Sequence, residues 1–108
     1  MGSIKKLNFE VCGKVQGVFF RKHTKKTCDK HGVAGWVLNT KGGTVQGFLE
    51  GSQQSVSKVK NWLKSVGSPK SRIDKCTFYN ECTVDTKSLT QFSIITEKTE
   101  VERRTFKT

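Results

Sequence analysis

The sequence predicts an α+β fold with the element order βαββαβ, in which two helices cover one face of a four-stranded antiparallel sheet. Three observations predict it: short segments with alternating apolar and polar residues, two longer segments without Gly or Pro, and glycine-containing turns between them. A right-handed crossover in each βαβ half places both helices on the same face. The expected architecture is a ferredoxin-like sandwich whose other face is open to water.

The first half of the chain supplies a strand, a helix and a hairpin. Apolar and polar residues alternate over Lys6–Cys12, as in a half-buried strand. Phe20–His31 has neither Gly nor Pro and is followed by Gly32, a residue common just after helices, so a helix is predicted there. Val33–Asn39 and Thr44–Glu50 are predicted strands, and the two glycines in the short loop between them indicate a β-hairpin.

The second half supplies the other helix and the final β segments. Ser52 is the expected N-cap of a helix that stops at Gly67, with apolar residues in steps of three and four at Val56, Val59, Leu63 and Val66. Lys75–Val84 is rich in β-forming residues, and a last strand is marked by Phe92, Ile94 and Ile95. We expect residues 1–96 to form one domain and the polar residues 97–108 to form a mobile tail.

Composition narrows the class of protein without naming a function. Twenty Lys and Arg against nine Asp and Glu give a net charge of +11, which attracts nucleic acids, acidic membranes and small phosphorylated metabolites alike. No apolar run approaches the roughly 20 residues of a membrane span, so we expect no membrane insertion. Because the N-terminus has no apolar leader, we expect a cytoplasmic protein, and we expect it to be a monomer. Its four cysteines are irregularly spaced, so we expect them to be free thiols that bind no metal.

The segment Gly13–Arg21 is the strongest candidate for a binding site. It leads from a strand into a helix, where backbone amides lack partners and attract anions. Gly13 and Gly17 allow a tight turn, and the guanidinium of Arg21 suits bidentate contact with phosphate. The segment is neither a Walker A loop nor a dinucleotide-binding fingerprint. Taken alone, it is more often an ordinary tight turn with an exposed Arg.

Two motifs together resemble one family. Val11–Arg21, of the form V-x-G-x-V-Q-G-V-x-F-R, is similar to the first signature of the acylphosphatase family, and Gly35–Asn39 with the glycines that follow resembles its second. Gly67–Pro69 and Ser71–Asp74 are similar to a further familiar stretch, so the resemblance covers about residues 7 to 96. Leu38 departs from the second signature, in which Lys, Arg, Gln, Ala or Met usually precedes the Asn.

The resemblance implies a ferredoxin-like enzyme that hydrolyses small acyl phosphates to a carboxylate and inorganic phosphate. It implies that Arg21 and Asn39 are catalytic, with Asn39 positioning the attacking water. It also implies that Arg21 binds phosphate together with the loop amides of Val15, Gln16, Gly17, Val18, Phe19 and Phe20. No metal and no cofactor are implied. His23 and His31 receive no catalytic role.

An RNA-recognition module shares the same element order and suits a basic chain. By strand alternation, Trp36, Leu38 and Phe48 are expected on the open sheet face, where aromatic side chains can stack on bases. The third strand, however, offers only Phe48 where that module needs a basic residue and alternating aromatics. We therefore expect no nucleic-acid partner, and a catalytically silent binding protein on the same scaffold is the remaining alternative.

Overall fold

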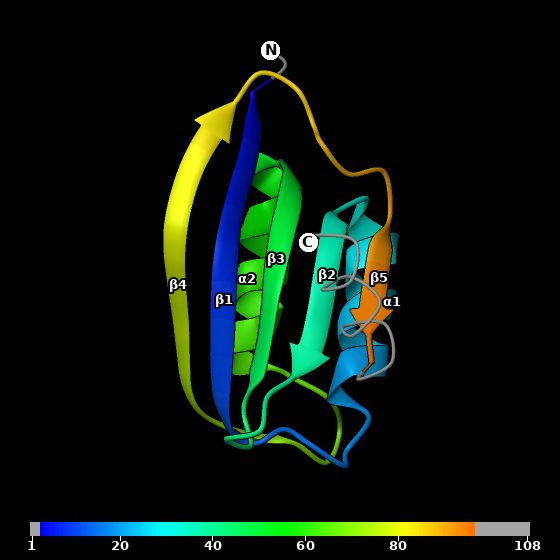
Figure 1. Cartoon of the computed structure of the whole chain (residues 1–108), viewed down its shortest axis with the longest axis vertical. Coiled ribbons are helices and arrows are strands. Elements are labelled where there is room, and N and C mark those ends of the chain that lie inside the picture. Colours follow the sequence, from blue (N-terminus) through cyan, green and yellow to red (C-terminus); the bar gives the residue numbers. More distant parts are fainter. Residues whose placement is uncertain (1–2, 97–108) are drawn as a thin grey trace, which may run out of the picture.

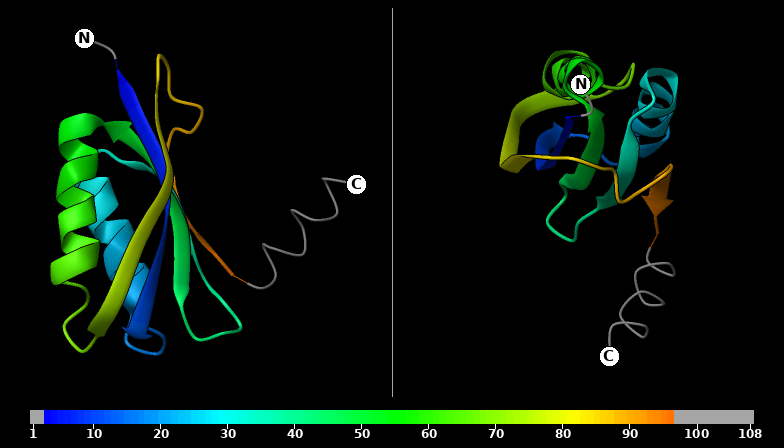
Figure 2. Two further views of the ribbon diagram at one scale, coloured as in Figure 1. Left: turned by 90° about the vertical axis from the view of Figure 1, so that its left-hand side faces the viewer. Right: turned by 90° about the horizontal axis from the view of Figure 1, so that it is seen from above.

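The computed structural model describes residues 3–96 of the 108-residue chain, so the expected tail over 97–108 lies outside the described residues. The elements follow one another as β1 (Ile4–Lys14), α1 (Phe20–His31), β2 (Ala34–Asn39), β3 (Val45–Ser52), α2 (Gln53–Ser65), β4 (Arg72–Val84) and β5 (Phe92–Ile95) (Figure 1). Both helices lie on the same face of the sheet, as predicted (Figure 2).

The prediction of four antiparallel strands is wrong. The sheet has five strands in the order β4-β1-β3-β2-β5, and β5 runs parallel to β2. β4 ends at the end of the sheet where β2 begins, and the chain then crosses that end to the free edge of β2 (Figure 1). Because it arrives where β2 starts, the last strand has to run in the direction of β2. The two final β segments therefore occupy opposite edges of one mixed sheet.

The alternation predicted for the first strand is confirmed, and the strand is longer than expected. Leu7, Phe9 and Val11 are fully buried, while the residues between them are only partly covered. β1 pairs with β3 on one side and β4 on the other, and this double pairing extends the strand to Ile4–Lys14. The longest run of backbone pairing thus leads directly into the loop before α1.

The second helix follows its predicted pattern up to its last turn. The hydroxyl of Ser52 accepts a hydrogen bond from the amide of Ser55 at 3.2 Å, the expected N-cap contact. Val56, Val59 and Leu63 are buried against the sheet. Val66 is 59 % exposed, because it comes after the end of the helix and no longer follows the helical repeat.

The first helix has a narrow apolar face, and contacts at its two ends hold it in place. Its buried residues are Phe20, Thr24 and Cys28, and the Thr24 hydroxyl donates to the carbonyl of Phe20 at 2.8 Å, which allows a polar side chain to be buried. Gly32 adopts a left-handed conformation with φ 69° and ends the helix as predicted. The Phe20 ring packs against Trp62 of α2 at 5.4 Å between centroids, so the start of α1 is fixed by the core.

A buried carboxylate holds the connection between β4 and β5. Glu50 is 1 % exposed, and its oxygens accept hydrogen bonds from the amides of Ser88 and Leu89 at 2.8–3.1 Å and from the Ser88 hydroxyl. Burial alone would raise the pKa of this carboxyl, but these hydrogen bonds outweigh it and keep the pKa below its ordinary value. The charge therefore stays in place and anchors the segment that delivers β5 to the sheet edge.

The open sheet face carries aromatic side chains where alternation predicts them. Trp36 and Phe48 are partners in the β2–β3 register, and their rings stack at 6.4 Å between centroids. Val37 and Leu49, next to them in sequence, are fully buried on the helix side. The same alternation directs Asn39, two residues after Val37, toward the helices and the loop before α1.

Candidate active site

The loop between β1 and α1 has an unusual backbone. Gly17 has φ 75°, and Phe19, immediately before the helix, has φ 58°. Glycine adopts this left-handed region freely, whereas for Phe it carries a steric cost of about 1–2 kcal/mol. Burial of apolar side chains on both sides of the turn offsets this cost and holds the loop in place; these side chains are Val15, Val18 and Phe20.

The amides of this loop are not used elsewhere in the described chain. The first backbone hydrogen bond into α1 is donated by the amide of His23 to the carbonyl of Phe19 at 3.1 Å. Within residues 3–96, none of the backbone amides of residues 16–21 donates to another backbone carbonyl. Such a set of unpaired donors at the start of a helix is a binding site for an anion.

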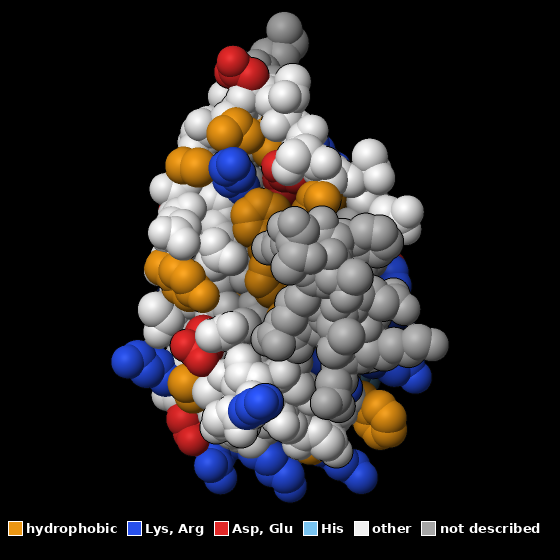
Figure 3. All heavy atoms as spheres, in the orientation of Figure 1, with side chains coloured by type: hydrophobic (Ala, Val, Ile, Leu, Met, Phe, Trp, Pro, Cys, Tyr) orange, Lys and Arg blue, Asp and Glu red, His pale blue; other side chains and the backbone are white. Residues whose placement is uncertain are grey.

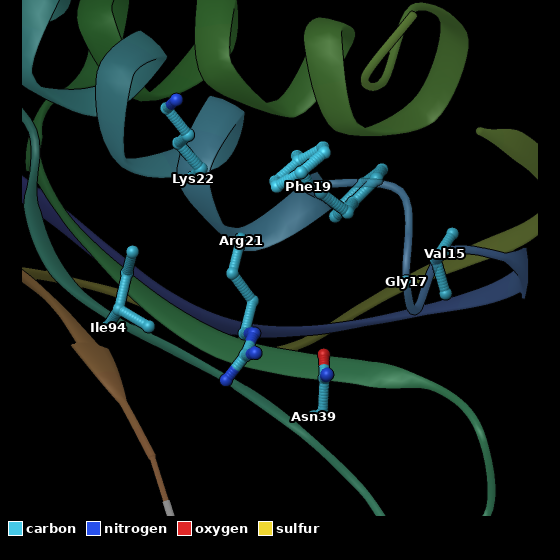
Figure 4. Close-up of a pocket in the computed structure, with 8 residues that line it drawn as sticks. Val15, Gly17, Phe19, Arg21, Lys22, Asn39 and Ile94 are labelled. Carbon is cyan, nitrogen blue, oxygen red and sulfur yellow. The ribbon is translucent and has the colours of Figure 1, made fainter. Parts of the chain in front are cut away.

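Arg21 adds a cation to the same place. It lies in the first turn of α1, is half-buried, and extends from the helix toward the end of β2, where Asn39 lies (Figure 4). Among the residues that the structure describes, Arg21 forms no ion pair with a carboxylate. Its planar set of donors is therefore available for a ligand.

Asn39 ends β2 and brings an acceptor to the cavity. Its amide oxygen is buried and has no hydrogen-bond partner among the described residues. A buried unpartnered acceptor costs about 1–3 kcal/mol, and most such atoms in proteins are paired. Figure 4 shows this oxygen turned toward the loop, between Arg21 and Gly17. The atom is positioned to accept a hydrogen bond from a small molecule in the cavity.

Gln16 connects the loop to the β2–β3 turn. Its side-chain amide donates to the carbonyls of Thr40 and Thr44, each at 2.8 Å. The hydroxyls of these two threonines lie 2.6 Å apart, and that of Thr44 also donates to Glu10 at 2.7 Å. Because Thr40 directly follows Asn39, this network fixes the distance between the loop and the Asn39 side chain.

These elements enclose a cavity of about 420 Å³. Of the residues predicted for the site, those that line it are Val15, Gly17, Phe19, Phe20, Arg21 and Asn39. The side chains of Gln16 and Val18 do not line it, because one bonds to the hairpin and the other is buried. A neighbouring hollow of about 430 Å³ shares Arg21 and Asn39 and extends past Leu38 and Lys41.

Two lining residues were missed from the sequence. Lys22 follows Arg21 on α1, and Ile94 belongs to β5. Lys22 could have been predicted as a lining residue, because it directly follows Arg21 in the sequence. Ile94 reaches the cavity only because β5 pairs with β2, a pairing that the four-stranded prediction did not contain. Neither His23 nor His31 lines the cavity.

The charge and the titratable groups around the site favour anion binding. Figure 3 shows Lys and Arg side chains gathered at the end of the molecule that carries the β1–α1 loop and the β2–β3 turn. Within residues 3–96, no group of three or more His, Cys, Asp or Glu side chains could hold a metal ion. All four cysteines are free, and burial raises the pKa of the Cys28 thiol, which keeps it protonated and a poor nucleophile.

No helix in the described part of the chain has the length and hydrophobicity needed to cross a membrane.

Three comparisons relate the chain to proteins that are similar to it in sequence and fold. The family model described as acylphosphatase matches residues 7–94. The acylphosphatase-2 of Homo sapiens is 48% identical over 92 residues, covering 85% of this chain and 93% of that protein, and that of Rattus norvegicus is 46% identical over 91 residues, covering 84% and 94%. The crystal structure of acylphosphatase from Bacillus subtilis superposes with a TM-score of 0.78 at 30% identity, covering 85% of this chain and 99% of that one.

The fold and the comparisons together define an α+β domain of the hydrolase class, with a loop of unpaired amides before its first helix. The match over most of its length shows that the chain belongs to the acylphosphatase family. It is therefore an enzyme of the acylphosphatase type, and the resemblance found in its two sequence motifs is confirmed.

Proposed function

We propose that this chain hydrolyses small acyl phosphates by in-line attack of a water molecule on phosphorus. The amides of residues 15–20 and the guanidinium of Arg21 hold the phosphate, and Asn39 orients the water. One observation carries the proposal: the buried amide oxygen of Asn39 has no partner among the described residues and shares a cavity with Arg21 and the loop. An acceptor and an anion cradle are the two parts that such a reaction requires.

The chemistry explains why so few side chains are needed. A bond forms between the water oxygen and phosphorus while the bond from phosphorus to the acyl oxygen breaks, and the electron pair leaves with the carboxylate. A carboxylate is a good leaving group, so no acid has to protonate it. The proton of the water passes to a phosphate oxygen, which yields inorganic phosphate. The remaining requirement is to spread charge over the non-bridging oxygens, a task for amides and a guanidinium.

The role of Asn39 is positional. A carboxamide does not accept a full proton at neutral pH, so it cannot act as a general base. Its oxygen accepts a hydrogen bond from water and aims the lone pair of that water at phosphorus. The network through Gln16 supports this role, since it fixes the end of β2 relative to the phosphate loop.

The test is release of phosphate from benzoyl phosphate by the purified full chain in the presence of a metal chelator. We expect turnover that inorganic phosphate inhibits competitively. In water labelled with oxygen-18, the label should enter phosphate and not benzoate, because the attack is on phosphorus. A metal requirement, or label in benzoate, would contradict the mechanism.

The same preparation separates the alternatives. Salt-sensitive binding of single-stranded RNA without hydrolysis would favour the nucleic-acid module. Phosphate binding without turnover would identify a catalytically silent member of the family. A cytoplasmic, monomeric enzyme without metal or cofactor belongs to the same proposal, and sedimentation of the purified chain tests its oligomeric state.

A further inference from the structure

Phe19 combines two features that cost stability. Its side chain is 72 % exposed, and its backbone lies in the left-handed region at φ 58°. Buried neighbours on both sides explain the position of the backbone but not the choice of an aromatic residue. Exposed side chains on strained backbone occur mainly at functional sites, and this one lines the cavity that contains Arg21 and Asn39. The ring is therefore a candidate contact for the substrate.

The direction of attack gives this ring a specific neighbour. In an in-line displacement the leaving oxygen departs from the side of phosphorus opposite the attacking water. Water held by Asn39 approaches from the end of β2. Figure 4 places Phe19 at the opposite margin of the cavity, at the start of α1. The acyl group therefore leaves on the side of the molecule where the Phe19 side chain lies.

We propose that the ring of Phe19 binds the acyl group of the substrate and makes the enzyme prefer aromatic and bulky apolar acyl phosphates over small ones. This inference rests on the proposed function, because it uses the position of the attacking water. When an apolar acyl group covers the exposed ring, apolar surface of both is removed from water, which favours binding. An aromatic acyl group can also stack on the ring. A methyl group such as that of acetyl phosphate covers much less of the ring.

Lys22 completes the same margin of the cavity. Its ammonium lies 5.8 Å from the centroid of the Phe19 ring, within the range of a cation–π contact, and it lines the cavity. The carboxylate of the product forms next to the acyl group, so a cation held beside the ring stabilises the departing charge. Lys22 acts on every acyl phosphate alike, whereas Phe19 distinguishes among them.

The test compares kcat/KM for benzoyl phosphate and acetyl phosphate in the full chain and its variants. The ratio of the two constants removes any loss that a substitution causes through the loop backbone. For Phe19→Ala we expect the ratio of benzoyl to acetyl phosphate to fall by about fivefold to tenfold. Phe19→Tyr, which keeps the ring, should restore the ratio of the unaltered chain.

Tyr79→Ala is the matched control, because it removes another exposed aromatic side chain, from β4, that does not line the cavity. It should leave the ratio unchanged. A ratio that stays within twofold in Phe19→Ala, or that falls equally in Tyr79→Ala, would overturn the role of Phe19 while leaving the proposed function intact. If the unaltered chain hydrolyses neither substrate, the proposed function fails first, and this inference fails with it.

Discussion

Two polar side chains in this molecule place oxygen atoms in buried positions but have opposite surroundings. Glu50 accepts hydrogen bonds from Ser88 and Leu89 with both carboxylate oxygens, whereas the amide oxygen of Asn39 has no partner within residues 3–96. Glu50 lies two residues before the end of β3, and Asn39 is the last residue of β2. The first is a closed contact that holds the fold together. The second is an open acceptor beside a set of unpaired amides.

The difference in hydrogen bonding between Glu50 and Asn39 indicates that the first residue serves stability and the second serves function. Removing a satisfied buried group leaves its former partners unpaired, so the fold is weakened. Removing an unsatisfied group takes away a cost instead, so the fold should tolerate it and only the chemistry should suffer. Substitutions in the two regions should therefore give opposite patterns of stability and activity.

The largest effect is expected at Arg21. Arg21→Ala removes the cation of the anion site, and we expect kcat/KM for benzoyl phosphate to fall roughly a thousandfold, with weaker inhibition by phosphate. Arg21→Lys should recover only part of the loss, because it restores the charge but not the planar pair of donors. Steady-state kinetics measure both.

Lys26→Ala provides the control for charge alone. It removes one positive charge from the same helix at an exposed position outside the cavity. An equal loss of kcat/KM in Lys26→Ala and Arg21→Ala would show that general electrostatic attraction, and not the site, binds the substrate.

The next largest effect is expected on stability. Glu50→Ala leaves the amides of Ser88 and Leu89 without their acceptor, and we expect the free energy of unfolding in urea to fall by about 2–4 kcal/mol. Glu81→Ala is the control, since Glu81 pairs with Lys5 and Lys60 at the surface and solvent screens these contacts. An equal loss in the control would mean that burial of Glu50 is unimportant. The turnover number of folded Glu50→Ala should be close to that of the unaltered chain.

The loop, Arg21 and Asn39 could be predicted as a site from the sequence because they fall in two short motifs, and in the structure they line one cavity. The helix over Gln53–Ser65 was predictable because its apolar repeat is local. The last strand was predicted from its residues, but its position in the sheet was not. Its pairing with β2 depends on a connection that crosses the end of the sheet, which no local pattern reveals. The role of Glu50 was also missed, since its partners lie 38 and 39 residues further along the chain.

A smaller effect is expected where the two parts of the site are joined. Gln16→Ala removes the donor shared by the carbonyls of Thr40 and Thr44, which frees the end of β2 from the phosphate loop. We expect kcat to fall by about tenfold with little change in phosphate inhibition, because alignment is lost and the amides remain. Gln16→Glu has the same shape but no donor toward these carbonyls, so kcat should fall as in Gln16→Ala, and its added negative charge should also weaken phosphate inhibition. Full activity in either variant would show that the tether does not align the site.

The most direct test of the central claim is to measure the activity and the stability of Asn39→Ala on the same preparation. An acceptor that orients water and has no structural partner predicts a fall in kcat of roughly a hundredfold or more. It also predicts a free energy of unfolding within about 1 kcal/mol of the unaltered chain. Unchanged kcat, or a loss of stability as large as that of Glu50→Ala, would contradict the assignment of Asn39 to the chemistry.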